Sequence, residues 1–149
     1  MLDDLDIKIL NLLQNNARIK RNVISETVGL SLPSVSERLH KLEEKGFIQG
    51  YFTKLERKAF GYDILAYVFV TMDSSKHYKS LISKVEKNPM IIECHSVLGE
   101  GSHLLKVIAK KTASLEKLLG EIQSWPGVVS TKTTYILSAI KETTEIDIQ

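Results

Sequence analysis

The sequence lacks the cysteines of disulfide-bonded or zinc-binding proteins and the long apolar stretches of membrane-spanning proteins. Among its 149 residues is one cysteine, Cys94, so an internal disulfide and a multi-cysteine zinc site are both excluded. The longest apolar stretches, such as Ile64 to Val70, are far shorter than the roughly 20 residues of a transmembrane helix. The chain opens Met1-Leu2-Asp3-Asp4, which is acidic where a signal peptide is basic. We therefore expect a cytoplasmic protein with no membrane association.

Basic residues are unevenly distributed along the chain. All four arginines lie between residues 18 and 57, a window with eight basic and five acidic side chains. Residues 62–149 hold ten lysines and ten acids, so their formal charge is zero. This asymmetry indicates a polyanion-binding module joined to a neutral remainder, although an arginine-rich solvated surface would look the same.

The first third of the chain has the apolar spacing of three helices. Asp3 or Asp4 can cap the first, and the second runs from Arg21 to Val28 with a turn at Gly29. Ser31 caps the third helix, which has Pro33 in its first turn and ends at Gly46. The expected buried positions are Leu5, Ile9, Leu12 and Leu13, then Ile24 and Val28, then Val35, Leu39 and Leu42. The aromatic and β-branched residues of Phe47 to Lys54 predict a strand.

Two helices joined by a glycine turn, with Ser-x-Pro at the start of the second, match a helix-turn-helix. The outer face of the third helix carries hydroxyl, carboxylate and basic groups, which can contact DNA base edges and phosphates. The predicted DNA-binding residues are Arg18, Lys20, Arg21, Ser31, Pro33, Ser34, Ser36, Glu37, Arg38, His40 and Lys41. Lys41 has Glu37 four residues before it, whereas Arg38 has no acid three or four residues away, which makes Arg38 the better candidate for DNA. The alternative for Arg38 is an acidic partner on another helix, such as Glu26. A three-helix bundle with a polar face for protein contacts is the alternative.

The remainder of the chain is an internal repeat. Residues 64–98 and 101–135 match at an offset of 37 without a gap. Each half reads as strand, helix, strand, so the expected fold is α+β: a winged helix-turn-helix domain followed by a ferredoxin-like βαββαβ sandwich. The apolar helix positions that recur are Tyr78, Leu81, Ile82 and Val85 in the first half and Leu115, Leu118, Leu119 and Ile122 in the second.

Two glycines lie in the connection between the halves, Leu98-Gly99-Glu100-Gly101-Ser102. Glycine permits backbone conformations that other residues avoid and lets a ligand approach closely. A plain hairpin turn explains the same residues. No helix follows directly, so this is not a phosphate-binding loop.

Several motifs resemble the Lrp/AsnC, or feast/famine, family of transcription regulators. Leu2-Asp3-x-x-Asp6-x-x-Ile9-Leu10 resembles the opening of that family, and the run from Gly29-Leu30-Ser31 to Gly46-x-Ile48 resembles its DNA-reading signature. Glu93-Cys94-His95-x-x-x-Gly99 and Leu104-Leu105-Lys106-Val107 resemble its sensor domain. Pro126-Gly127-Val128 and Thr131-Lys132-Thr133 resemble its last strand.

The resemblance implies a domain organisation and partners. Residues 1–46 would be the DNA-binding domain, 47–61 a linking strand and connector, and 62–149 the ligand-sensing and oligomerisation domain. It further implies double-stranded DNA as a partner, a homodimer formed through the sheet, and an octamer of four dimers. An amino-acid effector would bind between dimers, near Gly99, Glu100, Gly101, Ser102, His103, Thr131, Thr133 and Tyr135.

Three positions depart from the family pattern. Lys20 stands where the family usually has a capping Ser or Thr, and Ser25 where it usually has Ala. Gly101-Ser102-His103 stands where many members have Tyr-Asp-Tyr, whose acid is expected to meet the ammonium group of the effector. This loss predicts weak or altered amino-acid binding, or a DNA-architectural protein of the same fold with no effector.

Catalysis is not indicated. None of the four histidines, His40, His77, His95 and His103, has the spacing of a metal ligand, so we expect no metal or cofactor. Cys94 and His95 are neighbours on a predicted strand and face opposite sides, so they cannot act together as nucleophile and base. A scaffold that has lost DNA binding is the third possibility, and the intact signature of the third helix argues against it.

Overall fold

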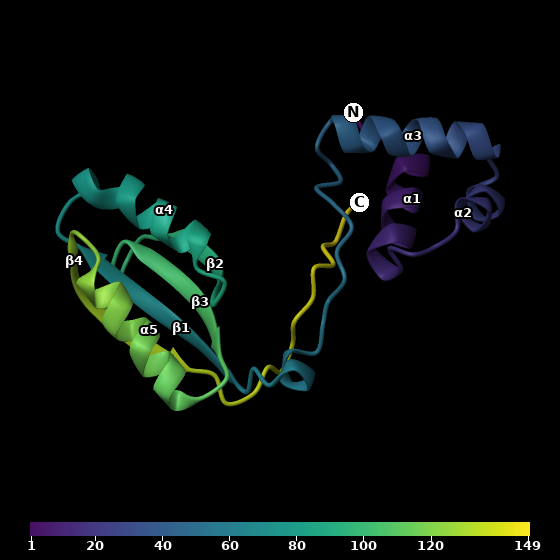
Figure 1. Cartoon of the computed structure of the whole chain (residues 1–149). Coiled ribbons are helices and arrows are strands. Elements are labelled where there is room, and N and C mark those ends of the chain that lie inside the picture. Colours follow the sequence, from purple (N-terminus) through teal and green to yellow (C-terminus); the bar gives the residue numbers. More distant parts are fainter. The chain divides into compact units, whose positions relative to one another are not determined.

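A computed structural model describes all residues from 1 to 149 and divides them into two compact units. The first unit comprises Met1–Lys54 together with Lys141–Gln149, and the second comprises Leu55–Ile140 (Figure 1). The chain therefore leaves the first unit once and returns to it at the C-terminus. None of the helices combines the length and apolar character that crossing a membrane requires.

The first unit is built on three helices, α1 (Asp4–Asn15), α2 (Arg21–Val28) and α3 (Leu32–Glu44). Asp3 caps α1 through a reciprocal pair: the Asp6 amide donates to Asp3 Oδ1 at 2.8 Å, and the Asp3 amide donates to Asp6 Oδ2 at 3.2 Å. Gly29 ends α2 in the left-handed region at φ +71°, and the Ser31 hydroxyl caps α3 by accepting from the Ser34 amide. The predicted caps are thereby confirmed.

The core of the first unit joins all three helices. Its buried residues are Ile9, Leu10, Ile24, Val35, Leu39 and Leu42. The stripe predicted for α3 is confirmed in full. In α1 the prediction missed Leu10, while Leu5, Leu12 and Leu13 are only partly buried. Both Ile9 and Leu10 enter the cluster with α2 and α3, so the buried face of α1 is broader than one helical row.

The strand predicted at Phe47–Lys54 is wrong. These residues have no regular structure, and a short 3₁₀ helix, η1 (Arg57–Phe60), follows them. Aromatic and β-branched residues favour a strand only where a neighbouring strand can pair with their backbone, and this unit has none. The structure divides the chain near residue 54, within the predicted connector 47–61, and groups residues 141–149 with the first unit.

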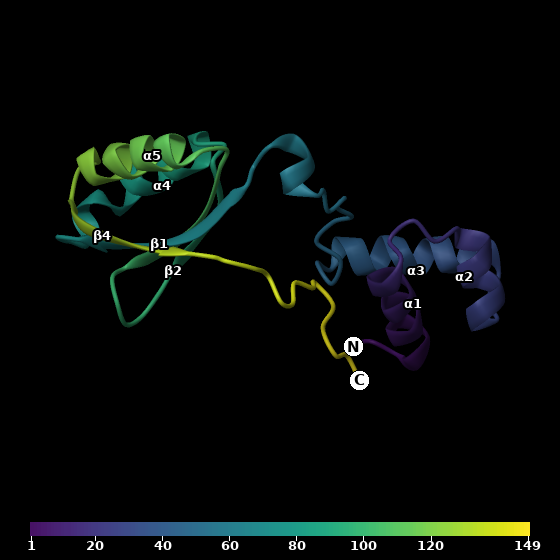
Figure 2. The same cartoon turned by 90° about the horizontal axis from the view of Figure 1, so that it is seen from below.

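The second unit is a four-stranded antiparallel sheet with both helices on one face (Figure 2). Its elements in order are β1 (Ile64–Met72), a 3₁₀ turn η2 (Ser75–His77), α4 (Tyr78–Lys87), β2 (Ile91–Ser96), β3 (His103–Ala109), α5 (Thr112–Ser124) and β4 (Val128–Tyr135). The strand order is β2-β3-β1-β4. The predicted βαββαβ sandwich is confirmed.

The register of the sheet pairs equivalent positions of the two halves of the internal repeat. Val68 of β1 lies directly opposite Leu105 of β3, and these positions are 37 residues apart, the offset of the repeat. Both side chains are fully buried. A pseudo-twofold axis therefore passes between them, and the two β-α-β halves share one core beneath α4 and α5.

Candidate DNA-binding surface and effector loop

Helix α3, which carries most of the predicted DNA-binding residues, buries one face and presents the other to solvent. Val35, Leu39 and Leu42 point into the core, whereas Glu37, His40 and Lys41 are exposed and Ser34, Ser36 and Arg38 are half-buried. Arg18, Lys20 and Arg21, before and at the start of α2, are also exposed. The predicted DNA-binding residues thus all lie where solvent reaches them.

One contact joins the basic start of α2 to the recognition helix. The Arg21 Nη1 group donates to Ser36 Oγ at 3.3 Å. A predicted phosphate contact and a predicted base contact therefore lie side by side, which the sequence separation of 15 residues did not show.

Arg38 pairs with two acidic residues at the start of α1. Its Nη1 donates at 2.7 Å to both Asp3 Oδ2 and Asp6 Oδ1, the capping pair of α1. The arginine thus has acidic partners on another helix, which was the alternative to a DNA contact, and they are Asp3 and Asp6 of α1 rather than Glu26. Backbone and Arg38 hydrogen bonds lower the pKa of Asp3, and the two carboxylates raise the pKa of Arg38. Arg38 braces α3 against the start of α1.

Lys41 has only the surface partner that its spacing predicted. Its Nζ lies 2.7 Å from Glu37 Oε1, and both side chains are more than half exposed. The hydrogen bond from Lys41 lowers the pKa of Glu37. Exposed ion pairs of this kind contribute little to stability, so Lys41 can leave Glu37 and bind a phosphate with little loss of free energy. His40 makes a similar exposed pair with Glu44 at 3.3 Å.

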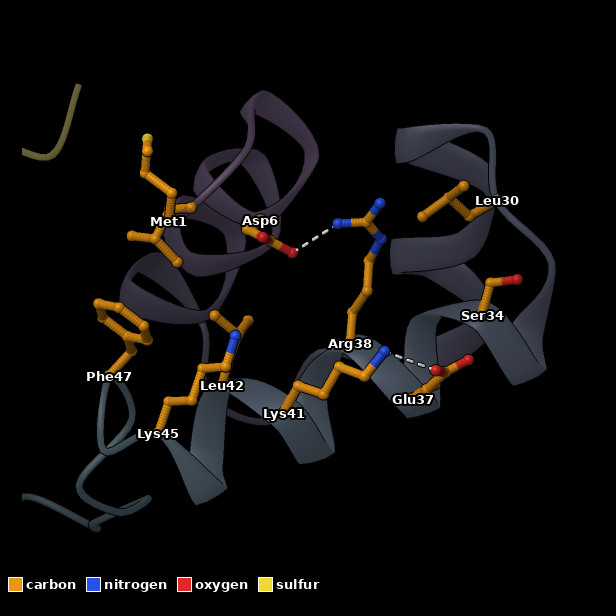
Figure 3. Close-up of a pocket in the computed structure, with 11 residues that line it drawn as sticks. Met1, Asp6, Leu30, Ser34, Glu37, Arg38, Lys41, Leu42, Lys45 and Phe47 are labelled. Atoms are coloured by element: carbon orange, nitrogen blue, oxygen red, sulfur yellow. Dashed lines mark hydrogen bonds and ion pairs between the residues drawn. The ribbon is translucent and has the colours of Figure 1, made fainter.

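A cavity of about 330 Å³ opens between the start of α1 and α3, beside these bases (Figure 3). Arg38, Lys41 and Lys45 line it with the apolar side chains of Met1 and Phe47. Lys45 is not among the predicted DNA-binding residues, although its position four residues after Lys41 places it on the same face of the helix. The exposed lysines at the end of α3 therefore extend the basic surface beyond the predicted residues.

The two departures in α2 have visible local consequences. Lys20 provides no side-chain cap, so the first amides of α2 lack a hydroxyl partner there. The Ser25 hydroxyl donates to the Leu30 carbonyl oxygen across the turn between α2 and α3. Ser25 thereby ties the turn to α2 by a hydrogen bond, in place of the apolar contact that alanine would make.

The glycine loop between β2 and β3 is packed against the end of β1. Gly101 has φ +78°, and a Cβ there would lie 2.7 Å from the Val70 carbonyl oxygen, so glycine is required. The next amide, of Ser102, donates to that same oxygen at 2.9 Å. The Ser102 hydroxyl lies 2.8 Å from His103 Nδ1 and 3.3 Å from the Val70 oxygen. The Ser102 hydroxyl, at the position where many members of the family are expected to have an acid, is therefore already bonded within the chain.

His103 is the one buried polar side chain of the protein, with 3% exposure. Its ring packs edge-on against Tyr78, with centroids 4.8 Å apart. Burial lowers the pKa of His103, so the ring is neutral near neutral pH.

The strand register brings His103 and Thr131 to either side of Val70 on the helix-covered face of the sheet. Thr131 is half-buried and accepts from Gln123 Nε2 at 2.9 Å. Thr133 and Tyr135 follow on the same face of β4 and are exposed. The structure thus gathers Ser102, His103 and Thr131 at one end of the sheet.

Glu100 does not turn towards this group of residues. Its Oε2 lies 3.0 Å from Lys132 Nζ, and both side chains are about 70% exposed. Lys132 alternates with Thr131 and Thr133 along β4 and so points to the opposite face. Glu100 therefore lies at the solvent-exposed tip of the turn, and its carboxylate is not directed towards Ser102.

Cys94 and His95 face opposite sides of β2, as predicted. Cys94 packs against the core, where burial raises the pKa of its thiol, while exposed His95 lies 3.1 Å from Glu93. Hydrogen bonds from His95 and Lys106 lower the pKa of Glu93. No group of three or more His, Cys, Asp or Glu side chains is placed to hold a metal ion.

Comparison with known proteins identifies the architecture. Residues 65–146 match the family model of the Lrp/AsnC ligand binding domain, and residues 2–49 match that of a winged helix-turn-helix DNA-binding domain. The chain belongs to the Lrp/AsnC family. It is 34% identical to the HTH-type transcriptional regulator FL11 of Pyrococcus horikoshii, over 99% of this chain and 97% of that protein. It is also 34% identical to the leucine-responsive regulatory protein of Escherichia coli, over 99% and 92% of the two chains.

Solved structures of transcriptional regulators have the same fold. A transcriptional regulator of Neisseria meningitidis in complex with L-methionine superposes with a TM-score of 0.92 at 28% identity, covering 99% of this chain and 97% of that one. AsnC of Escherichia coli superposes with a TM-score of 0.89 at 27% identity, covering 97% and 98%. The protein is therefore a DNA-binding transcriptional regulator of the Lrp/AsnC type, and the functional class predicted from the sequence is confirmed.

Proposed function

We propose that α3 reads DNA from the major groove with Ser34, Ser36, Glu37 and His40, while Lys41 holds a phosphate. The single observation that carries this assignment is the division of α3: its apolar row is buried, and its polar and basic row is exposed. Arg18, Lys20 and Arg21 supply further phosphate contacts, and the exposed Ser31 and Pro33 at the start of α3 approach the backbone. Arg38 acts through Asp3 and Asp6, by orienting α3.

A binding assay on DNA from upstream of the protein's own gene tests this surface. Lys41→Ala should weaken binding and reduce the log–log salt slope by about one, because one phosphate contact is lost. Glu37→Ala and Ser36→Ala should change the preferred base sequence more than the affinity. Lys117→Ala, an exposed lysine on α5, is the matched control and should change neither. Unchanged affinity and preference in all three α3 variants would contradict the assignment.

We infer a homodimer formed through the helix-free face of the sheet, and an octamer of four dimers. This face presents Tyr67, Phe69, Leu104 and Ile108, which are half-exposed although no helix covers them. An apolar patch of this kind on a sheet is typical of a protein interface. Two recognition helices also read a longer site than one can, which a specific regulator needs. Native mass spectrometry separates monomer, dimer and octamer, and a monomer at micromolar concentration would contradict both assemblies.

The effector site is proposed at the Gly99–His103 loop and the strand positions Thr131, Thr133 and Tyr135. Regulators from Neisseria meningitidis and Mycobacterium tuberculosis have been solved with L-methionine, so an α-amino acid is the class to expect. We propose weak binding here, because Ser102 offers a neutral acceptor to the ammonium group and is already bonded to its neighbours. The second candidate function, a DNA-architectural protein with no effector, rests on the same observation and on the pairing of Glu100 with Lys132.

Calorimetry against the twenty amino acids decides between these two functions. Weak heats from one or a few amino acids, lost in Ser102→Tyr, support an effector site at the loop. The absence of any heat supports the architectural function. Tight binding that Glu100→Gln leaves intact and Ser102→Tyr abolishes would show that the missing acid is not needed. Either function would be carried out in the cytoplasm, where the DNA is.

A further inference from the structure

The last nine residues are docked on the DNA-binding unit. The Gln14 side-chain amide pairs with both backbone groups of Ile146: Gln14 Nε2 donates to the Ile146 carbonyl at 3.0 Å, and the Ile146 amide donates to Gln14 Oε1 at 2.7 Å. Gln14 thus pairs with the tail as a neighbouring strand would, and Asn11 Oδ1 orients its amide by accepting at 3.2 Å. The end of the tail, residues 141–149, lies next to α1 in Figure 1, and Figure 2 gives a second view of this end.

Two further contacts fasten the tail. Lys54 Nζ lies 2.9 Å from Glu142 Oε2 at one end, and Ile148 packs against the core of α1, α2 and α3 at the other. Apolar, ionic and hydrogen-bonding contacts are therefore spread over seven consecutive residues. The tail is held along its length as a part of the first unit.

Docking changes the sign of the charge on this unit. Residues 1–54 carry eight basic and seven acidic side chains, a formal charge of +1. The tail adds one lysine and the acids Glu142, Glu145 and Asp147, which bring the unit to −1. A DNA-binding domain gains its sequence-independent affinity from positive potential, so these carboxylates oppose the approach of a polyanion.

We propose that the docked C-terminal tail is an anionic restraint on DNA binding, built into the chain. This inference rests on the proposed DNA-binding function of α3. Glu145 and Asp147 are exposed, and neither carboxylate makes an ion pair or a hydrogen bond, so neither charge takes part in the contacts that hold the tail. Displacement of the tail from Gln14 removes fixed negative charge from the unit and strengthens its attraction for DNA phosphates.

The test compares two double variants of the full chain with equal changes in total charge. Glu145→Gln/Asp147→Asn neutralises the tail while keeping Gln14, Lys54, Glu142 and Ile148, and returns the first unit to +1. The control Glu116→Gln/Glu121→Gln removes two exposed acids from α5 of the second unit. Fluorescence anisotropy measures binding to a random-sequence duplex at low and high salt.

The tail variant should bind this duplex about fivefold more tightly than wild type at about 50 mM salt, where the screening length is roughly 14 Å. The gain should shrink at high salt, and the control should change affinity by less than about twofold. A tail variant that binds no more tightly than the control would overturn the proposal and leave the tail as a purely structural anchor.

Hydrogen exchange without DNA measures docking separately. The Ile146 amide should be protected in wild type and in the tail variant, and it should lose protection in Gln14→Ala. Gln14→Ala should also bind DNA more tightly than wild type, by a smaller factor, because the released carboxylates remain tethered. An unprotected Ile146 amide in wild type would overturn the docking itself. Protection of Ile146 together with no DNA binding by any protein would instead refute the DNA-binding assignment, and the restraint with it.

Discussion

Replacing Arg38 with methionine should loosen the DNA-binding unit more than it weakens DNA contacts. The variant keeps most of the apolar stem and removes the guanidinium that bridges Asp3 and Asp6 at 2.7 Å. The contact with Asp6 is the better protected, since that carboxylate is only 16% exposed and Arg38 itself 27%. A charge-assisted hydrogen bond in such a place, discounted for its partial exposure, is worth about 1–2 kcal/mol of the free energy of opening.

Native-state hydrogen exchange of the α1 and α3 amides measures that free energy in the full chain. Lys41→Met is the matched control on the same helix and should cost less than about 0.5 kcal/mol, because its pair with Glu37 is exposed. A double-mutant cycle with Asp6→Asn isolates the pair and should show a coupling of about 1 kcal/mol. The capping role of Asp6 cancels in this cycle.

The contribution of Arg38 should also depend on pH. The pKa of Asp3 in the folded chain lies below its ordinary value of 3.8, owing to the Asp6 amide and Arg38. The unfolded state therefore binds the proton more readily, so the stabilisation is present above pH 3.8 and is lost as the pH falls through the lowered value. The difference between wild type and Arg38→Met should shrink in that acid range. Equal opening free energies for the Arg38 and Lys41 variants, with a lower salt slope for Arg38→Met, would instead make Arg38 a DNA contact.

Three further outcomes test the second unit. Gly101→Ala should lower the free energy of unfolding, measured by urea denaturation, by about 2–3 kcal/mol, because a Cβ there meets the Val70 carbonyl oxygen. Gly99→Ala has open space around it and should cost only the backbone strain, about 1 kcal/mol. Phe69→Ser on the helix-free face should shift the sedimentation of the protein towards the monomer while its circular dichroism is unchanged. Burial lowers the pKa of His103 in the folded chain, so below pH 6.5 the unfolded chain binds this proton more readily than the folded chain does. The free energy of unfolding should therefore fall as the pH drops from 6.5 through the lowered pKa, and His103→Gln should reduce this pH dependence.

Local rules were enough to find the helix-turn-helix. Asp3, Gly29, Ser31 and Pro33 act on the backbone within four residues of themselves, so their types and spacing are readable in one dimension. The offset of 37 likewise predicted a βαββαβ sheet, because a strand-helix-strand pattern that occurs twice is compatible with only a few sheet topologies. In the structure, Val68 pairs with Leu105, the residue at the equivalent position of the second half.

Contacts between segments far apart in the sequence needed the tertiary structure. Arg38 has no acid within one helical turn, and only the packing of α3 against α1 brings Asp3 and Asp6 to it across 35 and 32 residues. Phe47–Lys54 has the composition of a strand, but pairing depends on a neighbour that this unit does not have. The return of residues 141–149 to Gln14 spans 132 positions, and a side-chain amide pairing with backbone groups leaves no periodic pattern to read. The periodicity of a sequence shows which face of a helix or strand is buried. The partners of a surface charge or of a chain end depend on how the elements pack, and periodicity does not show this.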